Sequence, residues 1–144
     1  MERRYFNQSQ PQTMQIAVFL LYANAVLGLV LSNDNRFLFE VAAGSLLRTS
    51  SDLTRLIGLL LALGFIVGSA VAAYLIANEK RIGYTLGLIV AAAPIVATVI
   101  VVTIGYPGRV RVIDAVDIGF LFDVALLALL LHQQTRSYQK IWFK

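Results

Sequence analysis

Cysteine is missing from this 144-residue chain, and its absence excludes disulfides, thiol nucleophiles, iron–sulfur clusters and cysteine-ligated zinc together. Histidine occurs once, at His132, with no carboxylate motif beside it, so neither a metal nor another cofactor is expected. Charged residues make up only 14% of the chain, against about 25% in an ordinary soluble domain. Together with an apolar content of 58%, this shortage of charge indicates a protein that lies in a membrane.

Recognisable catalytic motifs are missing as well. The chain has no GxSxG elbow, no HExxH metal motif, no phosphate-binding glycine loop and no nucleophile with a neighbouring base. A non-enzymatic role is therefore expected, and an interfacial enzyme that uses Asp114 or Asp117 is the minor alternative. The net charge of +4 comes from basic residues scattered between apolar runs, so anionic membrane lipid is the expected partner and nucleic acid is not.

Four long apolar runs are the main feature that is present. A helix needs roughly 20 apolar residues to cross about 30 Å of hydrocarbon, and each run is long enough to do so. The runs cover residues 14–32, 56–78, 82–105 and 113–131. They predict an all-α membrane protein, with residues 1–144 forming a single bundle of four transmembrane helices.

The charges between the runs predict how the helices are connected and oriented. Because only Glu79, Lys80 and Arg81 separate the second run from the third, those two helices should form a tight antiparallel hairpin. The distribution of basic residues predicts a multi-pass protein of the cell membrane, inner or plasma, with both termini in the cytoplasm. The cytoplasmic residues would be Arg3, Arg4, Lys80, Arg81, Arg136, Lys140 and Lys144, and the outer ones Arg36, Arg48, Arg55, Arg109 and Arg111.

The long outer connection, residues 33–55, is too apolar for a plain polar loop. Arg36 and Glu40 are four residues apart and suit an ion pair on a helical turn. The segment is expected either to lie in the membrane interface or to fold back over the bundle. Capping residues just before Asp52 predict that the second helix begins there, a turn before its apolar run.

Small residues recur every four positions in the second and third runs. Such series let helix backbones approach closely in lipid, where the hydrophobic effect does not drive association. They predict helix contact within the bundle or, as the alternative, a face for a homodimer or a membrane-protein partner. Pro94 in the third run predicts a kink. The two series are Gly64, Gly68 and Ala72, and Gly83, Gly87 and Ala91.

Asp123 stands near the middle of the fourth run, where an acid costs roughly 2.5 to 3.5 kcal/mol to insert and needs a partner. Asn24 lies at nearly the same depth in the first run, and its amide suits a carboxyl group. The pair is either a hydrogen bond that holds helices together or a proton- or cation-coupled site. Asp114, Asp117, Arg109 and Arg111 lie near the outer mouth, where they form interfacial ion pairs or an entrance towards Asp123.

The C-terminal tail reads as an amphipathic helix. Arg136, Lys140 and Lys144 repeat every four residues and are predicted to face anionic lipid headgroups. Tyr138 and Trp142, with Ile141, occupy another face and suit the headgroup level. Docking of the tail to a cytosolic protein is the alternative.

The run 120–131, followed by His132, Arg136 and Tyr138, resembles the end of uncharacterised small four-helix membrane proteins of bacteria, particularly of actinobacteria. The resemblance implies the same architecture and supplies no activity. Small four-helix multidrug transporters are similar in span count, but their membrane-embedded carboxylate belongs to the first helix, where this chain has Asn24. The leading hypothesis is a non-enzymatic accessory, scaffold or interaction subunit, and the alternative is a small transporter, channel component or ligand-binding bundle that uses Asp123.

Overall fold

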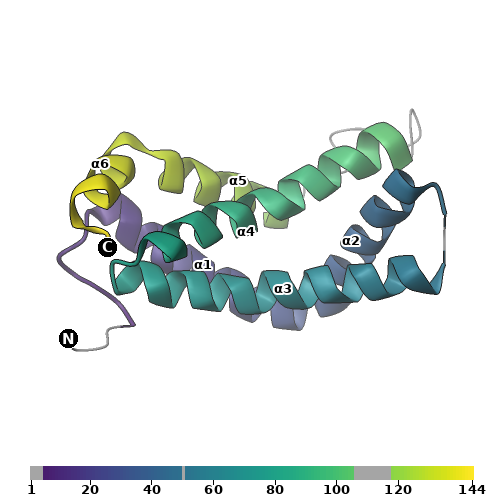
Figure 1. Ribbon diagram of the computed structural model, residues 1–144, viewed down its shortest axis with the longest axis horizontal. Coiled ribbons are helices and arrows are strands. Elements are labelled where there is room, and N and C mark those ends of the chain that lie inside the picture. The colour runs from purple at the N-terminus through teal and green to yellow at the C-terminus, as the bar shows by residue number, and fades with distance from the viewer. Residues whose placement is uncertain (1–4, 50, 106–117) are drawn as a thin grey trace.

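The structure is a computed structural model that describes residues 5–49, 51–105 and 118–144 (Figure 1). Within these ranges the chain is helical and contains no strand, which confirms the all-α prediction. The elements are α1 (Gln12–Val30), α2 (Ser32–Leu47), α3 (Asp52–Ala77), α4 (Arg81–Ile100), a π-helical segment η1 (Val101–Gly105), α5 (Ile118–Leu131) and α6 (Gln133–Trp142).

Three of the helical segments are long and apolar enough to cross a membrane. They are α1, α3 and the continuous stretch from α4 through η1, and they match the first three predicted runs within a few residues. The described part of the fourth run is α5, which has 14 residues and reaches the necessary length only together with α6, from which it is bent by 53°. The chain is therefore a multi-pass helical membrane protein by length and composition.

The predicted hairpin between the second and third runs is confirmed. A short turn joins α3 to α4, and the two helices pack side by side in opposite directions (Figure 1). Glu79 adopts a left-handed backbone conformation with φ of 58°, and the next amide, that of Lys80, donates to the Leu75 carbonyl at 2.9 Å. This pattern closes the end of α3 and reverses the chain within three residues.

The two small-residue series have different roles. In α4, a Cβ on Gly83 would lie 2.8 Å from the backbone nitrogen of Ile76, and Gly87 and Ala91 are also buried. These residues let α4 approach α3 closely, as predicted for contact within the bundle. In α3, Gly68 faces Val90 and Ala72 is buried, whereas Gly64 is exposed, with no atom within 4 Å of a Cβ placed there. Gly64 therefore makes no close helix contact within the described chain.

The connection predicted to lie outside is mainly the 16-residue helix α2, separated from α1 by Leu31 alone. It packs against α3, α4 and η1, which agrees with folding back over the bundle. Gly58 makes this approach close, since a Cβ there would lie 2.8 Å from the Glu40 backbone nitrogen.

The prediction of an ion pair between Arg36 and Glu40 is wrong for the described structure. Glu40 instead meets Arg55 of α3, with 3.6 Å between Nε and Oε1, because α2 packs against the start of α3 and brings that arginine across the helix contact. The beginning of α3 at Asp52 is as predicted, and the Thr54 hydroxyl accepts a hydrogen bond from the Ser51 amide at 3.1 Å.

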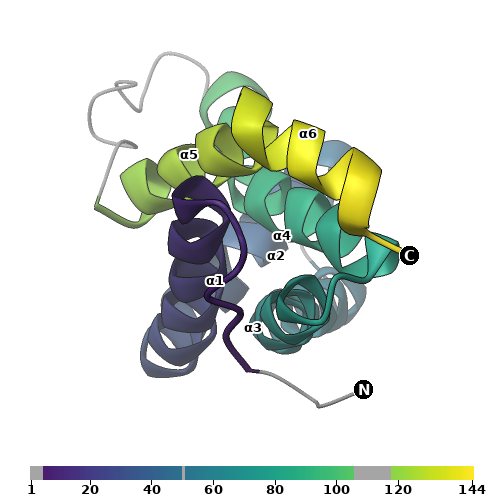
Figure 2. The ribbon, with the colours of Figure 1, turned by 90° about the vertical axis from the view of Figure 1, so that its left-hand side faces the viewer.

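The two ends of the bundle differ. At one end, α3 and α4 are joined by their turn, and both the N-terminal segment and the end of α6 contact that turn (Figures 1 and 2). Towards the other end, α3 and α4 diverge and α2 bridges them (Figure 1). α4 continues through Pro94, which is buried, before η1 begins at Val101. Both described chain ends thus lie at the same end of the molecule, as the predicted topology requires.

Candidate functional site

The two polar residues singled out at mid-membrane depth are in contact. Asn24 projects from α1 and Asp123 from α5, and the Asn24 amide donates to Asp123 Oδ1 at 2.8 Å. Both side chains are buried, with exposed fractions of 6% and 7%. The sequence places Asn24 and Asp123 at a similar depth in the membrane, and the structure brings their side chains into contact.

The surrounding apolar residues explain why the contact forms. On α1, Leu21 lies three residues before Asn24, and on α5, Leu126 and Leu130 lie three and seven residues after Asp123. All three leucines are fully buried. Each polar residue thus extends an apolar helix face that packs into the bundle, so packing of the leucines places the amide beside the carboxyl group.

We expect this contact to contribute measurably to stability. Asn24→Ala, Asp123→Ala and the double variant form a thermodynamic cycle for unfolding by dodecyl sulfate in mixed micelles. Hydrogen bonds between membrane helices average about 0.6 kcal/mol and reach about 1.7 kcal/mol, and the coupling free energy should fall in that range. A coupling free energy indistinguishable from zero would contradict a direct stabilising contact.

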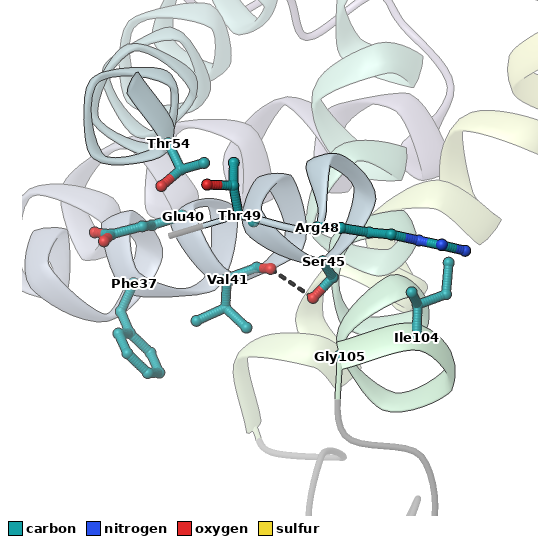
Figure 3. A pocket seen from close by; sticks show the side chains of 10 residues that line it. Phe37, Glu40, Val41, Ser45, Arg48, Thr49, Thr54, Ile104 and Gly105 are labelled. Atoms are coloured by element: carbon teal, nitrogen blue, oxygen red, sulfur yellow. Dashed lines mark hydrogen bonds between the residues drawn. The ribbon is translucent and has the colours of Figure 1, made fainter. Parts of the chain in front are cut away.

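A cavity of about 720 Å³, here named the α2 cavity, lies between α2, the start of α3 and the end of η1 (Figure 3). It is mixed in character, since Glu40, Arg48 and Thr54 line it beside Phe37 and Ile104. The Ser45 hydroxyl donates to the Val41 carbonyl at 2.7 Å on its wall (Figure 3). The four residues predicted to form an outer entrance lie outside the described residues: Arg109, Arg111, Asp114 and Asp117.

A second cavity, here named the lateral groove, has a volume of about 630 Å³ and lies where α3 and α4 diverge over α2. Its lining is apolar and rich in small side chains. Ile89 and Val96 on α4 are 60% and 54% exposed, so the groove opens to the surface of the bundle. Five alanines line it: Ala42, Ala43, Ala92, Ala93 and Ala97. Sequence reasoning missed the groove, because its alanines form one surface only when α2 folds across the two longer helices.

Glu79 joins three separate parts of the chain at the turn end. Its Oε1 accepts hydrogen bonds from the Asn7 amide at 3.1 Å and from the Tyr138 hydroxyl at 2.8 Å. Its carbonyl oxygen also accepts from the Lys144 amide at 3.0 Å. Burial, and secondly the hydrogen bond to Glu79, raise the pKa of Tyr138 above its ordinary value of 10.0. The sequence predicts Glu79 only as a residue of the turn. The one hint of a further role is that it is the only acidic residue between the two apolar runs.

The C-terminal tail is an amphipathic helix with one face against the bundle. Tyr138, expected among the headgroup aromatics, is half-buried against Glu79, while Ile141 and Trp142 are exposed. His132 has a structural role in α6, because its Nδ1 accepts from the Gln134 amide at 3.3 Å and caps the helix. The three basic residues predicted to face lipid are all exposed: Arg136, Lys140 and Lys144.

Asn24 and Asp123 are not among the described residues that line the α2 cavity or the lateral groove. The described residues also contain no cluster of three or more histidine, cysteine or acidic side chains suited to a metal ion. Comparison with protein families, with curated proteins and with solved structures finds no match to this chain.

Proposed function

We propose that the protein is a non-enzymatic accessory subunit of a membrane complex and that its lateral groove holds a transmembrane helix of a partner protein. In this proposal the bundle crosses the cell membrane four times, with α5 as the inner part of the fourth span and both termini in the cytoplasm. The groove is the observation that carries the proposal, since its lining comes from two of the membrane-crossing helices and from α2.

The side chains of the groove favour a helix as its occupant. Transmembrane helices associate through small residues that let their backbones approach closely, and alanine contributes heavily to this lining. Along α4 the lining extends from Ile89 to Ile100, which is about 16 Å or three turns of helix. A partner helix with small residues of its own would fit against such a surface and cover side chains that are exposed in the isolated chain.

Photocrosslinking in the native membrane tests this proposal. A benzophenone amino acid at Val96, which lines the groove, should crosslink to one protein of fixed mass. The same amino acid at Val71, which is 42% exposed on α3 and is not among the groove residues, should give little of that product. Ala93→Phe should block the groove and reduce the crosslink at Val96 at least tenfold, whereas Ala70→Phe, outside the groove, should leave it unchanged.

Three outcomes would overturn the proposal. Equal crosslinking at Val96 and Val71 would mean that the protein is recognised elsewhere. Crosslinks to lipid alone would make the groove an acyl-chain site. A product of twice the mass of the chain would make the occupant a second copy of the same protein.

A transport or ligand-binding role that uses Asp123 is the second candidate, and the buried carboxyl group on α5 is the observation that favours it. Asp123→Asn keeps the size of the side chain and removes its ability to ionise. If the carboxyl group binds a cation or carries a proton, this variant should abolish pH-driven flux in liposomes. Unchanged flux, or no flux in the wild type, would exclude the role for the ions tested.

A further inference from the structure

A small notch lies at the bend between α5 and α6. Its volume is about 320 Å³, and it is lined by Leu131 at the end of α5 and by Gln133, Arg136, Ser137 and Lys140 of α6. The four α6 residues repeat at intervals of three and one, so they share one helix face. The opposite face carries Thr135 and Tyr138, which are hydrogen-bonded to other parts of the bundle.

The polar groups in the notch suit an anion. Arg136 and Lys140 supply two positive charges, and among the described residues neither forms an ion pair within 4 Å. α6 contains no acidic residue. Glu79 accepts a hydrogen bond from Tyr138, which lies on the opposite face of α6, the face that packs against the bundle. The Gln133 amide and the Ser137 hydroxyl add hydrogen-bond donors. Arginine and lysine together with neutral donors form a set that matches the oxygens of a phosphate group.

The position of α6 places these donors near a membrane surface. α6 lies across the turn end of the bundle, transverse to α3 (Figures 1 and 2). Leu131 closes the apolar α5 and is 49% exposed, while Ile141 and Trp142 are 74% and 56% exposed. Exposed apolar and aromatic side chains beside basic ones on a transverse helix are typical of the boundary between headgroups and acyl chains.

We propose that this notch binds the phosphate of an anionic phospholipid, with Arg136 and Lys140 on its oxygens and an acyl chain against Leu131. The site is a discrete one for a single lipid, in addition to any general attraction of basic residues to the membrane. It is independent of the lateral groove, since the two share no lining residue.

Native mass spectrometry of the full chain released from nanodiscs tests the site. In discs that mix phosphatidylglycerol with phosphatidylcholine, the wild type should retain one phosphatidylglycerol molecule selectively. Arg136→Gln with Lys140→Gln should reduce this retention about thirtyfold, because the charge-assisted hydrogen bonds of both residues to the phosphate oxygens are lost. The matched control is Lys80→Gln with Lys144→Gln, which removes the same charge from exposed residues at the same end and should lower retention less than threefold.

The same assay distinguishes a discrete lipid site from diffuse attraction and from a site for free phosphate. Equal losses in the two double variants would replace the discrete site with diffuse attraction, and retention of phosphatidylcholine at the same level would remove the anionic preference. Excess inorganic phosphate should not displace the lipid, because phosphate lacks the acyl chain, and displacement would overturn the assignment to a lipid. Unchanged emission from Trp142, the sole tryptophan, would show that α6 stays docked in each variant.

Discussion

Gly83→Ala is expected to lower the free energy of unfolding by about 3 kcal/mol, the upper part of the usual range for overpacking. The added Cβ would lie 2.8 Å from the backbone nitrogen of Ile76 and equally close to the Leu75 carbonyl carbon. Because these are backbone atoms of α3, no side-chain rotation can relieve the clash, and α3 and α4 must separate. Unfolding by dodecyl sulfate in mixed micelles measures the loss.

Gly64→Ala is the matched control for this prediction. It makes the same change on α3, at a position where the new Cβ meets no atom within 4 Å. The free energy of unfolding should therefore not fall, and the helix preference of alanine over glycine should raise it by up to about 1 kcal/mol. If the two variants were equally unstable, glycine would be required for backbone conformation or for a contact outside the chain, and close approach at the turn would not explain the effect.

The close contact at Gly83 also accounts for the shape of the lateral groove. Glycine at residues 83 and 87 brings α4 against α3 near the turn, and the two helices diverge further along, where α2 lies between them (Figure 1). The groove therefore lies where α3 and α4 are far apart, while the hairpin turn holds the two helices together at their other ends. Under the proposed function, Gly83→Ala should consequently weaken binding of the partner's transmembrane helix as well as lower stability.

Hydropathy and depth predicted much of the architecture because both follow from local sequence. The first three membrane-crossing stretches, the tight α3–α4 hairpin and the beginning of α3 at Asp52 agree with the structure. The contact between Asn24 and Asp123 could be predicted because lipid leaves few partners for a polar group, and both residues stand at a similar depth.

Features that depend on how distant segments meet could not be predicted. Arg36 and Glu40 have the spacing of an ion pair, yet Glu40 contacts Arg55, because the packing of α2 against α3 decides which charges meet. The position of Tyr138 on the amphipathic tail suits an aromatic residue among lipid headgroups, but its hydroxyl donates a hydrogen bond to Glu79, 59 residues away in the sequence. Helical periodicity identifies a face and does not say whether lipid or protein covers it.

Phe143→Ala should release α6 from the bundle. Phe143 is only 2% exposed and packs edge-on against Tyr84 and Tyr138, with ring centroids 6.5 and 6.2 Å apart. Truncation of a buried phenylalanine costs about 3 to 5 kcal/mol, and Phe143 is the largest fully buried side chain at this end of the chain. Because few side chains of α6 itself are buried, the loss should appear as local opening of α6 before the bundle unfolds.

Hydrogen exchange measures that opening, and Ile141→Ala supplies the control. A loss of about 4 kcal/mol corresponds to roughly thousandfold faster exchange of the α6 amides, up to the rate of the unprotected helix, with α3 and α4 unchanged. Ile141 is two residues away and 74% exposed, so its truncation should leave exchange nearly unaltered. Equal acceleration in both variants would mean that α6 is held by its membrane-facing side chains, and equal protection in both would mean that the hydrogen bonds of Glu79 hold α6 without Phe143.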